Sequence, residues 1–334
     1  MELPSTISIA SSLFLPIVSF FLGIIYGYEI RKVSARLQSR RGPWLLVPKS
    51  LRGTLGVTRL FQPLYDIIKL LCKESLLPST STKGLFRSSP YIALICVIVA
   101  AAFTPVATYS HLASFELSLV VILYLLLGVP FAFILGGAAS ASPWGVIGSQ
   151  REAELMLGYE TPLVIAAFSI ATMADSLSVQ KIIDVQATRL PFLLLNPLAA
   201  VAFLVAIIGK LHLKPFDVPE AEVEIVAGPA TEYGGSLLAI IEIVKTFLIA
   251  ICVGLFIALF LAGGLVPGYE KLFSIPTFLL EGLLIVLVMT MIHTLNPRFR
   301  IDQALIWYVR VPTILAISGL VWAYAFRHFF PAFI

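Results

Sequence analysis

Acidic residues are concentrated in one short segment of the chain, residues 214–233, which reads KPFDVPEAEVEIVAGPATEY. The five acids of this segment are Asp217, Glu220, Glu222, Glu224 and Glu232. Pro215 and Pro219 bracket Asp217, and proline restricts both its own φ and the residue before it, so we expect a stiff, non-helical path here. Apolar residues alternate with the acids, which argues against an ordinary solvated loop. Carboxyl groups that are partly shielded from water have raised pKa values, so they can take up and release protons near neutral pH. The segment is therefore a candidate proton or ion relay.

Other ionisable residues lie in or beside strongly apolar stretches, where each costs about 2.5–3.5 kcal/mol even on the mildest scale. Glu242 and Lys245 are three residues apart and therefore share one face of a helix. They could form a structural ion pair between helices, or a pair that takes up and releases a proton. The other acids of this kind are Glu116, Glu154, Glu160 and Glu281. Several acids in neighbouring helices favour a hydrated polar path. Glu116 and Glu281 lie near the expected ends of helices, where a solvated carboxylate is the alternative.

The sequence predicts no metal or redox centre in this chain. Its three cysteines, Cys72, Cys96 and Cys252, are too scattered for a disulfide framework, a zinc site or an iron–sulfur cluster. Its four histidines lack the spacing of metal ligands. Its basic residues do not alternate with aromatic residues, and we expect no nucleic-acid partner.

The composition identifies the elements that must position these acids. Of 334 residues, 59% are hydrophobic and only 13% are charged, whereas soluble domains have about a quarter charged residues. A helix that spans a bilayer needs about 20 apolar residues. Eight stretches meet this requirement: 7–28, 90–110, 117–138, 155–175, 192–212, 237–263, 276–295 and 309–330. We therefore predict an all-α integral membrane protein with one polytopic domain over residues 1–334.

The distribution of lysine and arginine predicts the orientation of the chain. Residues 29–89 contain twelve of them, and the odd-numbered loops together contain eighteen against three in the even-numbered loops. The positive-inside rule then places the odd-numbered loops in the cytoplasm and both termini outside, in a multi-pass protein of a prokaryotic plasma membrane. The first stretch is not expected to be a signal peptide, because the positive charges follow it. Apolar residues at helical spacing predict an amphipathic helix near residues 62–74.

Four segments resemble the H subunit of respiratory complex I and its counterparts in energy-converting membrane-bound hydrogenases. The first comprises residues 40–43 (RRGP), residues 62–69 (QPLYDIIK) and Lys73-Glu74. The others are residues 158–162 (GYETP), residues 215–222 (PFDVPEAE) with the later Thr231-Glu232-Tyr233, and residues 298–302 (RFRID). The resemblance extends along nearly the whole chain, and its third segment is the most specific.

The resemblance implies that the chain anchors a cytoplasmic redox arm to an ion-pumping membrane arm with antiporter-like subunits. Its acids would begin a charged axis between the two arms. The candidate relay residues are Glu116, Glu154, Glu160, Asp217, Glu220, Glu222, Glu224, Glu232, Glu242 and Lys245. The candidate contacts with the redox arm are Arg36, Arg40, Arg41, Asp66, Lys69, Lys73 and Glu74.

One segment distinguishes between branches of this family. Residues 141–152 (ASPWGVIGSQRE) resemble the hydrogenase-type branch more than the quinone-reducing one. This implies hydrogenase-like large and small subunits on the cytoplasmic face, with a nickel–iron centre and iron–sulfur clusters in those partners and no cofactor in this chain. The alternative is the H subunit of a quinone-reducing NADH dehydrogenase, in which quinone would bind.

Two other classes of function remain as alternatives. A stand-alone secondary transporter could use Glu242 and Lys245 for ion coupling, although such proteins usually show inverted repeats, and the sequence shows none. A purely structural anchor would use its polar residues only to hold helices together. We expect a non-redox membrane subunit of a multisubunit oxidoreductase.

Overall fold

The computed structural model describes residues 6–40, 42, 61–106, 112–188, 190–264 and 274–329. Arg41 lies outside the described residues, and so does the side chain of Glu222. The long helices are α1 (Thr6–Leu37), α3 (Lys83–Phe103), α4 (Ser118–Ala139), α5 (Pro143–Ala174), α10 (Gly235–Phe260), α11 (Ser274–Leu295) and α13 (Pro312–Phe329), the last of which follows α12 (Ile301–Arg310). The shorter helices are α2 (Gln62–Leu71), α6 (Val179–Thr188), α7 (Phe192–Leu195), α8 (Pro197–Lys210) and α9 (Glu222–Ile225).

Seven segments of the described chain are long and apolar enough to cross a membrane, with α12 and α13 counted together. They correspond to seven of the eight predicted stretches and confirm an all-helical integral membrane protein. The predicted fifth stretch, residues 192–212, differs: it is divided into α7 and α8. At about 1.5 Å per residue, the 14 residues of α8 extend over about 21 Å, less than the roughly 30 Å of a bilayer core.

Asn196 explains the break between α7 and α8. Its side-chain oxygen accepts a hydrogen bond from the backbone N–H of Ala199 at 3.2 Å, and its amide nitrogen donates to the carbonyl oxygen of Gly319 in α13 at 2.9 Å. Pro197 follows at the first position of α8, where proline suits the start of a helix. Composition alone predicted one continuous apolar helix over residues 192–212. The Asn196 cap and Pro197 instead end α7 and start α8.

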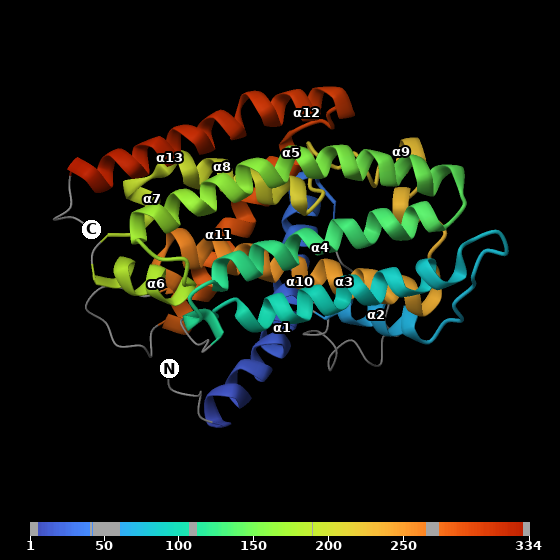
Figure 1. Cartoon of the computed structure of the whole chain (residues 1–334). Helices are drawn as coiled ribbons and strands as arrows, with labels where there is room; N and C mark the ends of the chain where they lie inside the picture. The colour runs from blue at the N-terminus through green and yellow to red at the C-terminus, as the bar shows by residue number, and fades with distance from the viewer. Residues whose placement is uncertain are drawn as a thin grey trace.

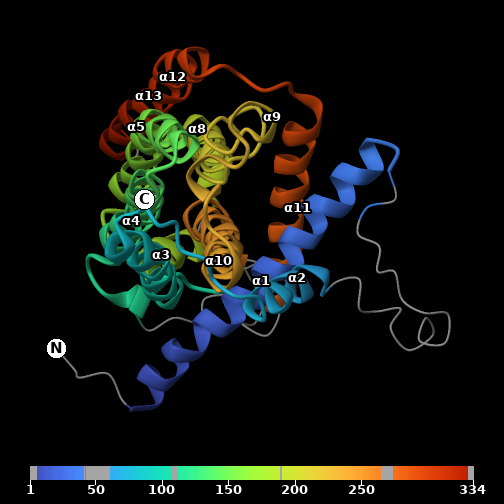
Figure 2. The same cartoon turned by 90° about the vertical axis from the view of Figure 1, so that its right-hand side faces the viewer.

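Helix α10 lies at the centre of the bundle, and most of its side chains are buried. Helices α3, α4, α5, α8 and α13 run beside one another (Figure 1), with α3 against α4 and α5 against both α8 and α13. Figure 2 views α10 nearly end-on and shows α1 crossing the bundle beside α11. At Gly23, a Cβ atom would lie 2.1 Å from the carbonyl oxygen of Thr246. Only glycine therefore allows α1 to approach α10 this closely.

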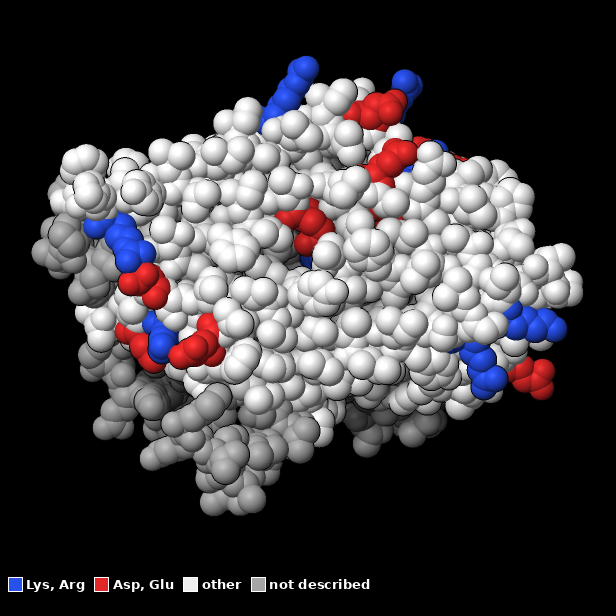
Figure 3. All heavy atoms as spheres, in the orientation of Figure 1, with Lys and Arg blue, Asp and Glu red and all other residues white. Residues whose placement is uncertain are grey.

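Charged side chains are unevenly distributed over the bundle. On the face in Figure 3 they gather at the two ends and along the upper edge, with an acidic group near the centre, and uncharged residues cover the rest. Helix α2, within the predicted amphipathic stretch, buries Pro63 and Ile67 and exposes Lys69. It packs on α10 and α1. The helices therefore form an apolar bundle that carries an amphipathic helix at one end.

Candidate functional site

The end of α8 brings a buried lysine to a buried glutamate in α5. Lys210 is 2% exposed and Glu160 is 8% exposed, and the two side chains form an ion pair. The ammonium group of Lys210 also lies 5.3 Å from the ring centroid of Tyr159, which is fully buried in α5. Each charge offsets the cost of burying the other, and the pair fixes α8 against α5.

Tyr159 continues this line of polar groups toward the loop after α8. Its hydroxyl donates a hydrogen bond at 3.0 Å to Oε1 of Glu152, which lies about two turns earlier on the same face of α5. The other carboxylate oxygen of Glu152, which is 1% exposed, lies 2.8 Å from Nε2 of His212. Glu152 therefore connects the helix α5 to the first turn of the acidic loop.

Glu220 in the acidic loop links His212 to α10. One of its carboxylate oxygens lies 3.5 Å from Nδ1 of His212, and the other accepts a hydrogen bond from Nζ of Lys245 at 2.6 Å. Lys245 also lies 3.9 Å from Glu242, one turn earlier in α10. We call the residues Glu160, Lys210, Tyr159, Glu152, His212, Glu220, Lys245 and Glu242 the charged axis.

The electrostatics of the loop follow from this alternation of charges. Burial by itself would lower the pKa of His212, but the carboxylates of Glu152 and Glu220 raise it to about 10. Burial acts to raise the pKa of Glu220, and Lys245 and His212 outweigh it and hold that pKa well below its usual range. His212 is therefore a cation and Glu220 an anion at neutral pH.

A cavity of about 210 Å³ opens beside the charged axis. Its polar walls are Arg31, Glu152, Tyr159, Lys210, His212, Glu220, Glu242 and Lys245, and its apolar walls include Pro63, Val129 and Phe133. A cavity of this size with several polar partners can hold a group of water molecules. The charged axis thus faces a hydratable space between α1, α2, α4 and α10.

Asp217 forms a separate ion pair at the edge of the acidic loop. Its Oδ2 accepts a hydrogen bond from Nη2 of Arg298 at 2.7 Å. Burial raises the pKa of Asp217, and Arg298 only partly offsets this effect. The backbone N–H of Phe299 donates to the carbonyl oxygen of Pro215 at 3.0 Å, and these contacts join the two loops.

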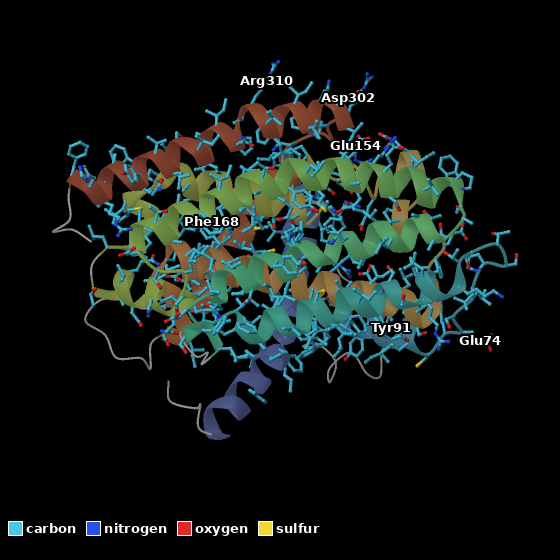
Figure 4. All side chains as sticks on the ribbon, viewed as in Figure 1. Glu74, Tyr91, Glu154, Phe168, Asp302 and Arg310 are labelled. Carbon is cyan, nitrogen blue, oxygen red and sulfur yellow. The ribbon has the colours of Figure 1, made fainter. Side chains whose placement is uncertain are left out.

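The structure does not bring the other predicted relay residues into the charged axis. Glu224 is exposed and pairs with Arg151 at 2.6 Å, and Glu154 accepts a hydrogen bond from Gln150. Figure 4 shows Glu154 on the outer side of α5, beside α12. Glu232 is half-buried. Glu116 is exposed before α4 and lines a separate hollow with Asp175, Lys181 and Arg327.

The predicted contacts with a redox arm lie on exposed surface around α2 and the end of α1. Arg36, Arg40, Lys69, Lys73 and Glu74 are exposed, and Figure 4 shows Glu74 pointing away from the body of the molecule. Asp66 is half-buried and pairs with Arg31 at 3.2 Å. All of these side chains except Asp66 remain available to a partner.

Sequence reasoning did not identify Glu152, Tyr159, Lys210 and His212 as site residues. Lys210 lies at the end of an apolar helix, and a lysine in that position requires a partner, which is a detectable signal. Glu152 and Tyr159 are seven residues apart and therefore on one stripe of a helix, which is a detectable signal. Among the described residues, no group of three or more His, Cys, Asp or Glu side chains is arranged to hold a metal ion.

Known proteins resemble this chain over most of its length. The NADH dehydrogenase family matches residues 9–324. The H subunit of the NADH-quinone oxidoreductase of Syntrophotalea carbinolica is 33% identical over 312 residues, covering 87% of this chain and 89% of the relative. The H subunit of the same enzyme in Dehalococcoides mccartyi (strain ATCC BAA-2266 / KCTC 15142 / 195) is 30% identical over 311 residues, covering 90% of this chain and 84% of the relative. A chain of the membrane-bound sulfane sulfur reductase, an archaeal respiratory membrane complex, superposes with a TM-score of 0.82 at 27% identity, covering 95% of this chain and 99% of that chain.

Proposed function

The chain belongs to the H-subunit family of NADH dehydrogenases, and from this premise we propose that it is the coupling subunit of a membrane-bound hydrogenase-type oxidoreductase. As a member of the family it is a subunit of a respiratory membrane complex. In the proposed role it links electron transfer in a cytoplasmic arm to translocation of H⁺ or Na⁺. The nickel–iron centre and the iron–sulfur clusters belong to hydrogenase-like partner subunits, and antiporter-like subunits receive the coupling signal.

The charged axis is the observation that carries this proposal. Its charges alternate in sign from Glu160 through Lys210, and from Glu152 through His212, Glu220 and Lys245. In surroundings of low dielectric constant, neutralising one member leaves its neighbour with an uncompensated charge, which is far more costly than in water. The neighbour must then change its partner or its protonation. Such a chain can transmit a change at the cavity to residues in α5 and α10.

Glu152 supports the hydrogenase-type reading. It lies at the end of residues 141–152, the segment that resembles that branch. It is 1% exposed and contacts both Tyr159 and His212 in the charged axis. One residue of the segment that resembles the hydrogenase branch therefore takes part in the proposed coupling path.

A second candidate is the H subunit of a quinone-reducing complex. It is favoured by the cavity between α1, α2 and α10, and by the curated relatives, whose names describe NADH-quinone oxidoreductases. Inhibitor-sensitive reduction of quinone by the purified complex would support it. Electron transfer to protons or to sulfur compounds without quinone reduction would support the first proposal.

The variant Glu220→Gln tests the coupling role. In proteoliposomes of the intact complex, we expect it to lower the number of ions translocated per electron, because Lys245 and His212 lose their shared anion. Separate assays of ²²Na⁺ uptake and of lumenal pH identify the ion. Glu224→Gln is the matched control, because Glu224 lies in the same loop but is exposed and pairs outside the axis. An unchanged ratio in an assembled Glu220→Gln complex would contradict the proposal.

The isolated chain distinguishes this role from that of a secondary transporter. In proteoliposomes without partner subunits, we expect no ion uptake. Uptake by the chain alone would support the transporter instead.

A further inference from the structure

A second group of buried polar side chains lies where α1 meets α11. Tyr26 in α1 is fully buried, and its hydroxyl points at α11. A Cβ atom on Gly282 would lie 2.1 Å from that hydroxyl oxygen. Glu281 precedes Gly282 in α11, and Glu29 follows Tyr26 by three residues, on the same face of α1.

Three oxygen atoms of this group lack hydrogen-bond partners in the part of the chain that the structure describes. They are Oη of Tyr26, Oε2 of Glu29 and Oε2 of Glu281, and all three are shielded from solvent. The three groups come from neighbouring positions of α1 and α11, and each presents a buried oxygen without a partner within the described ranges.

Charged residues on the surrounding helices have interactions of their own. On α1, Arg31 pairs with Asp66 of α2, and Lys32 has a contact of its own. On α10, Lys245 binds Glu220 and lies beside Glu242.

On α11, His293 accepts a hydrogen bond from the backbone N–H of Lys214 at 2.9 Å. No ion pair joins Glu29 or Glu281 to a basic residue in the described ranges. An ionised carboxylate without a counter-charge is expensive at this depth of a membrane protein.

We propose that Tyr26, Glu29 and Glu281 form a proton-binding site, in which at least one of the two carboxyl groups is protonated at neutral pH. A protonated carboxyl group is neutral and needs no counter-charge, and its O–H can donate a hydrogen bond where an ionised group can only accept one. The inference goes beyond the proposed function, because none of these residues belongs to the charged axis.

The backbone favours a proton over Na⁺ as the ligand. Membrane transporters coordinate Na⁺ largely through the carbonyl groups of unwound helices. Helices α1 and α11 are continuous through Tyr26, Glu29 and Glu281, and their carbonyl groups there remain in helical hydrogen bonds. Two carboxyl groups and a phenol suffice to hold a proton but leave a metal ion with few ligands.

Infrared difference spectra of the intact complex between acidic and alkaline pH test this site. We expect a C=O band of a protonated carboxyl group that is lost in the double variant Glu29→Gln/Glu281→Gln. Tyr26→Phe should shift this band, because loss of the hydroxyl makes the surroundings of the carboxyl groups less polar. Asp184→Asn, a change at an exposed carboxylate of α6, is the control and should leave the band in place. An identical band in the wild type and the assembled double variant would overturn the proposal.

Dicyclohexylcarbodiimide, which reacts with protonated carboxyl groups in apolar surroundings, provides a second measurement. Peptide mapping should find the label on Glu281 or Glu29 at neutral pH and less of it as the pH rises. If Na⁺ at constant pH suppresses both the band and the label, the site binds Na⁺ and the proton assignment is wrong. These outcomes are independent of Glu220→Gln, so failure of the proton site leaves the coupling test unaffected.

Discussion

The buried carboxyl groups near two different faces of α1 differ in whether a cationic side chain lies beside them. The face with Gly23 and Gly27 borders the cavity of the charged axis, where Glu160 and Glu220 each have a cationic partner. The other face carries Tyr26 toward α11, where Glu29 and Glu281 form no ion pair with a basic residue of the described ranges. The comparison teaches that the partner, more than the acid itself, decides whether a buried glutamate carries a charge or a proton.

The distribution of cations along the chain produces this difference. Lys210, His212 and Lys245 lie in the segment from α8 to α10, which folds onto α5. Within α11, the only ionisable residues are Glu281 and His293. Among the described residues, Glu29 and Glu281 accordingly form no ion pair across the contact between α1 and α11. The charged axis can transmit a displacement of charge, whereas the α1–α11 contact can only hold or release a proton.

Removing a cation from the charged axis should have the largest effect. Lys210→Met leaves Glu160 buried without its partner, and breaking a buried ion pair costs about 3–5 kcal/mol. We expect a large fall in the midpoint temperature of thermal unfolding of the purified complex, or loss of this subunit from it. Adding Glu160→Gln should recover much of this loss, because the uncompensated charge is removed. A single variant as stable as the wild type would show that the pair is not buried in the assembled complex.

Filling the space beside Tyr26 should have an intermediate effect. The methyl group of Gly282→Ala would clash with the Tyr26 hydroxyl, and overpacking of this kind costs about 1–3 kcal/mol. We expect a lower unfolding midpoint and a changed carboxyl C=O band, with partial recovery when Tyr26→Phe is added. Gly84→Ala is the control, because no atom lies within 4 Å of a Cβ at Gly84. Equal midpoints for the two alanine variants would exclude the close contact between α1 and α11.

The pH dependence of stability should show the most gradual effect, because it is spread over several pH units. The pKa of His212 is raised from 6.5 to about 10, so its stabilising contribution is complete below pH 6.5 and decreases as the pH rises to about 10. The loss amounts to at most about 1.4 kcal/mol per pH unit. We expect the unfolding midpoint of the wild type to fall with pH across this range and that of His212→Gln to change less. Parallel profiles would show that His212 is not the titrating group.

Local features of the fold could be predicted from the sequence because they depend on composition and on short spacing. Apolar stretches of about 20 residues predicted seven of the membrane helices, and helical periodicity predicted α2. The ion pair between Glu242 and Lys245 follows from their separation of three residues. The division of residues 192–212 was missed, although Asn196 and Pro197 together are a recognisable start of a helix.

The partners of the buried acids could not be predicted in the same way. Glu160 and Lys210 are 50 residues apart, and Glu220 and Lys245 are 25 residues apart. No periodicity within one helix relates such residues, because their distance depends on how α8, the acidic loop and α10 pack against α5. The preference of Lys245 for Glu220 over its neighbour Glu242 is likewise a property of packing.

By itself, the sequence determined that this protein is a helical membrane bundle with more acids in and beside its apolar segments than a bilayer readily tolerates. The transfer free energy of each side chain is sufficient for that conclusion. Only the tertiary structure decided which acids have a cation and which have none. Electrostatic interactions in surroundings of low dielectric constant depend on distances of a few ångströms between helices, and those distances exist only after the helices have packed.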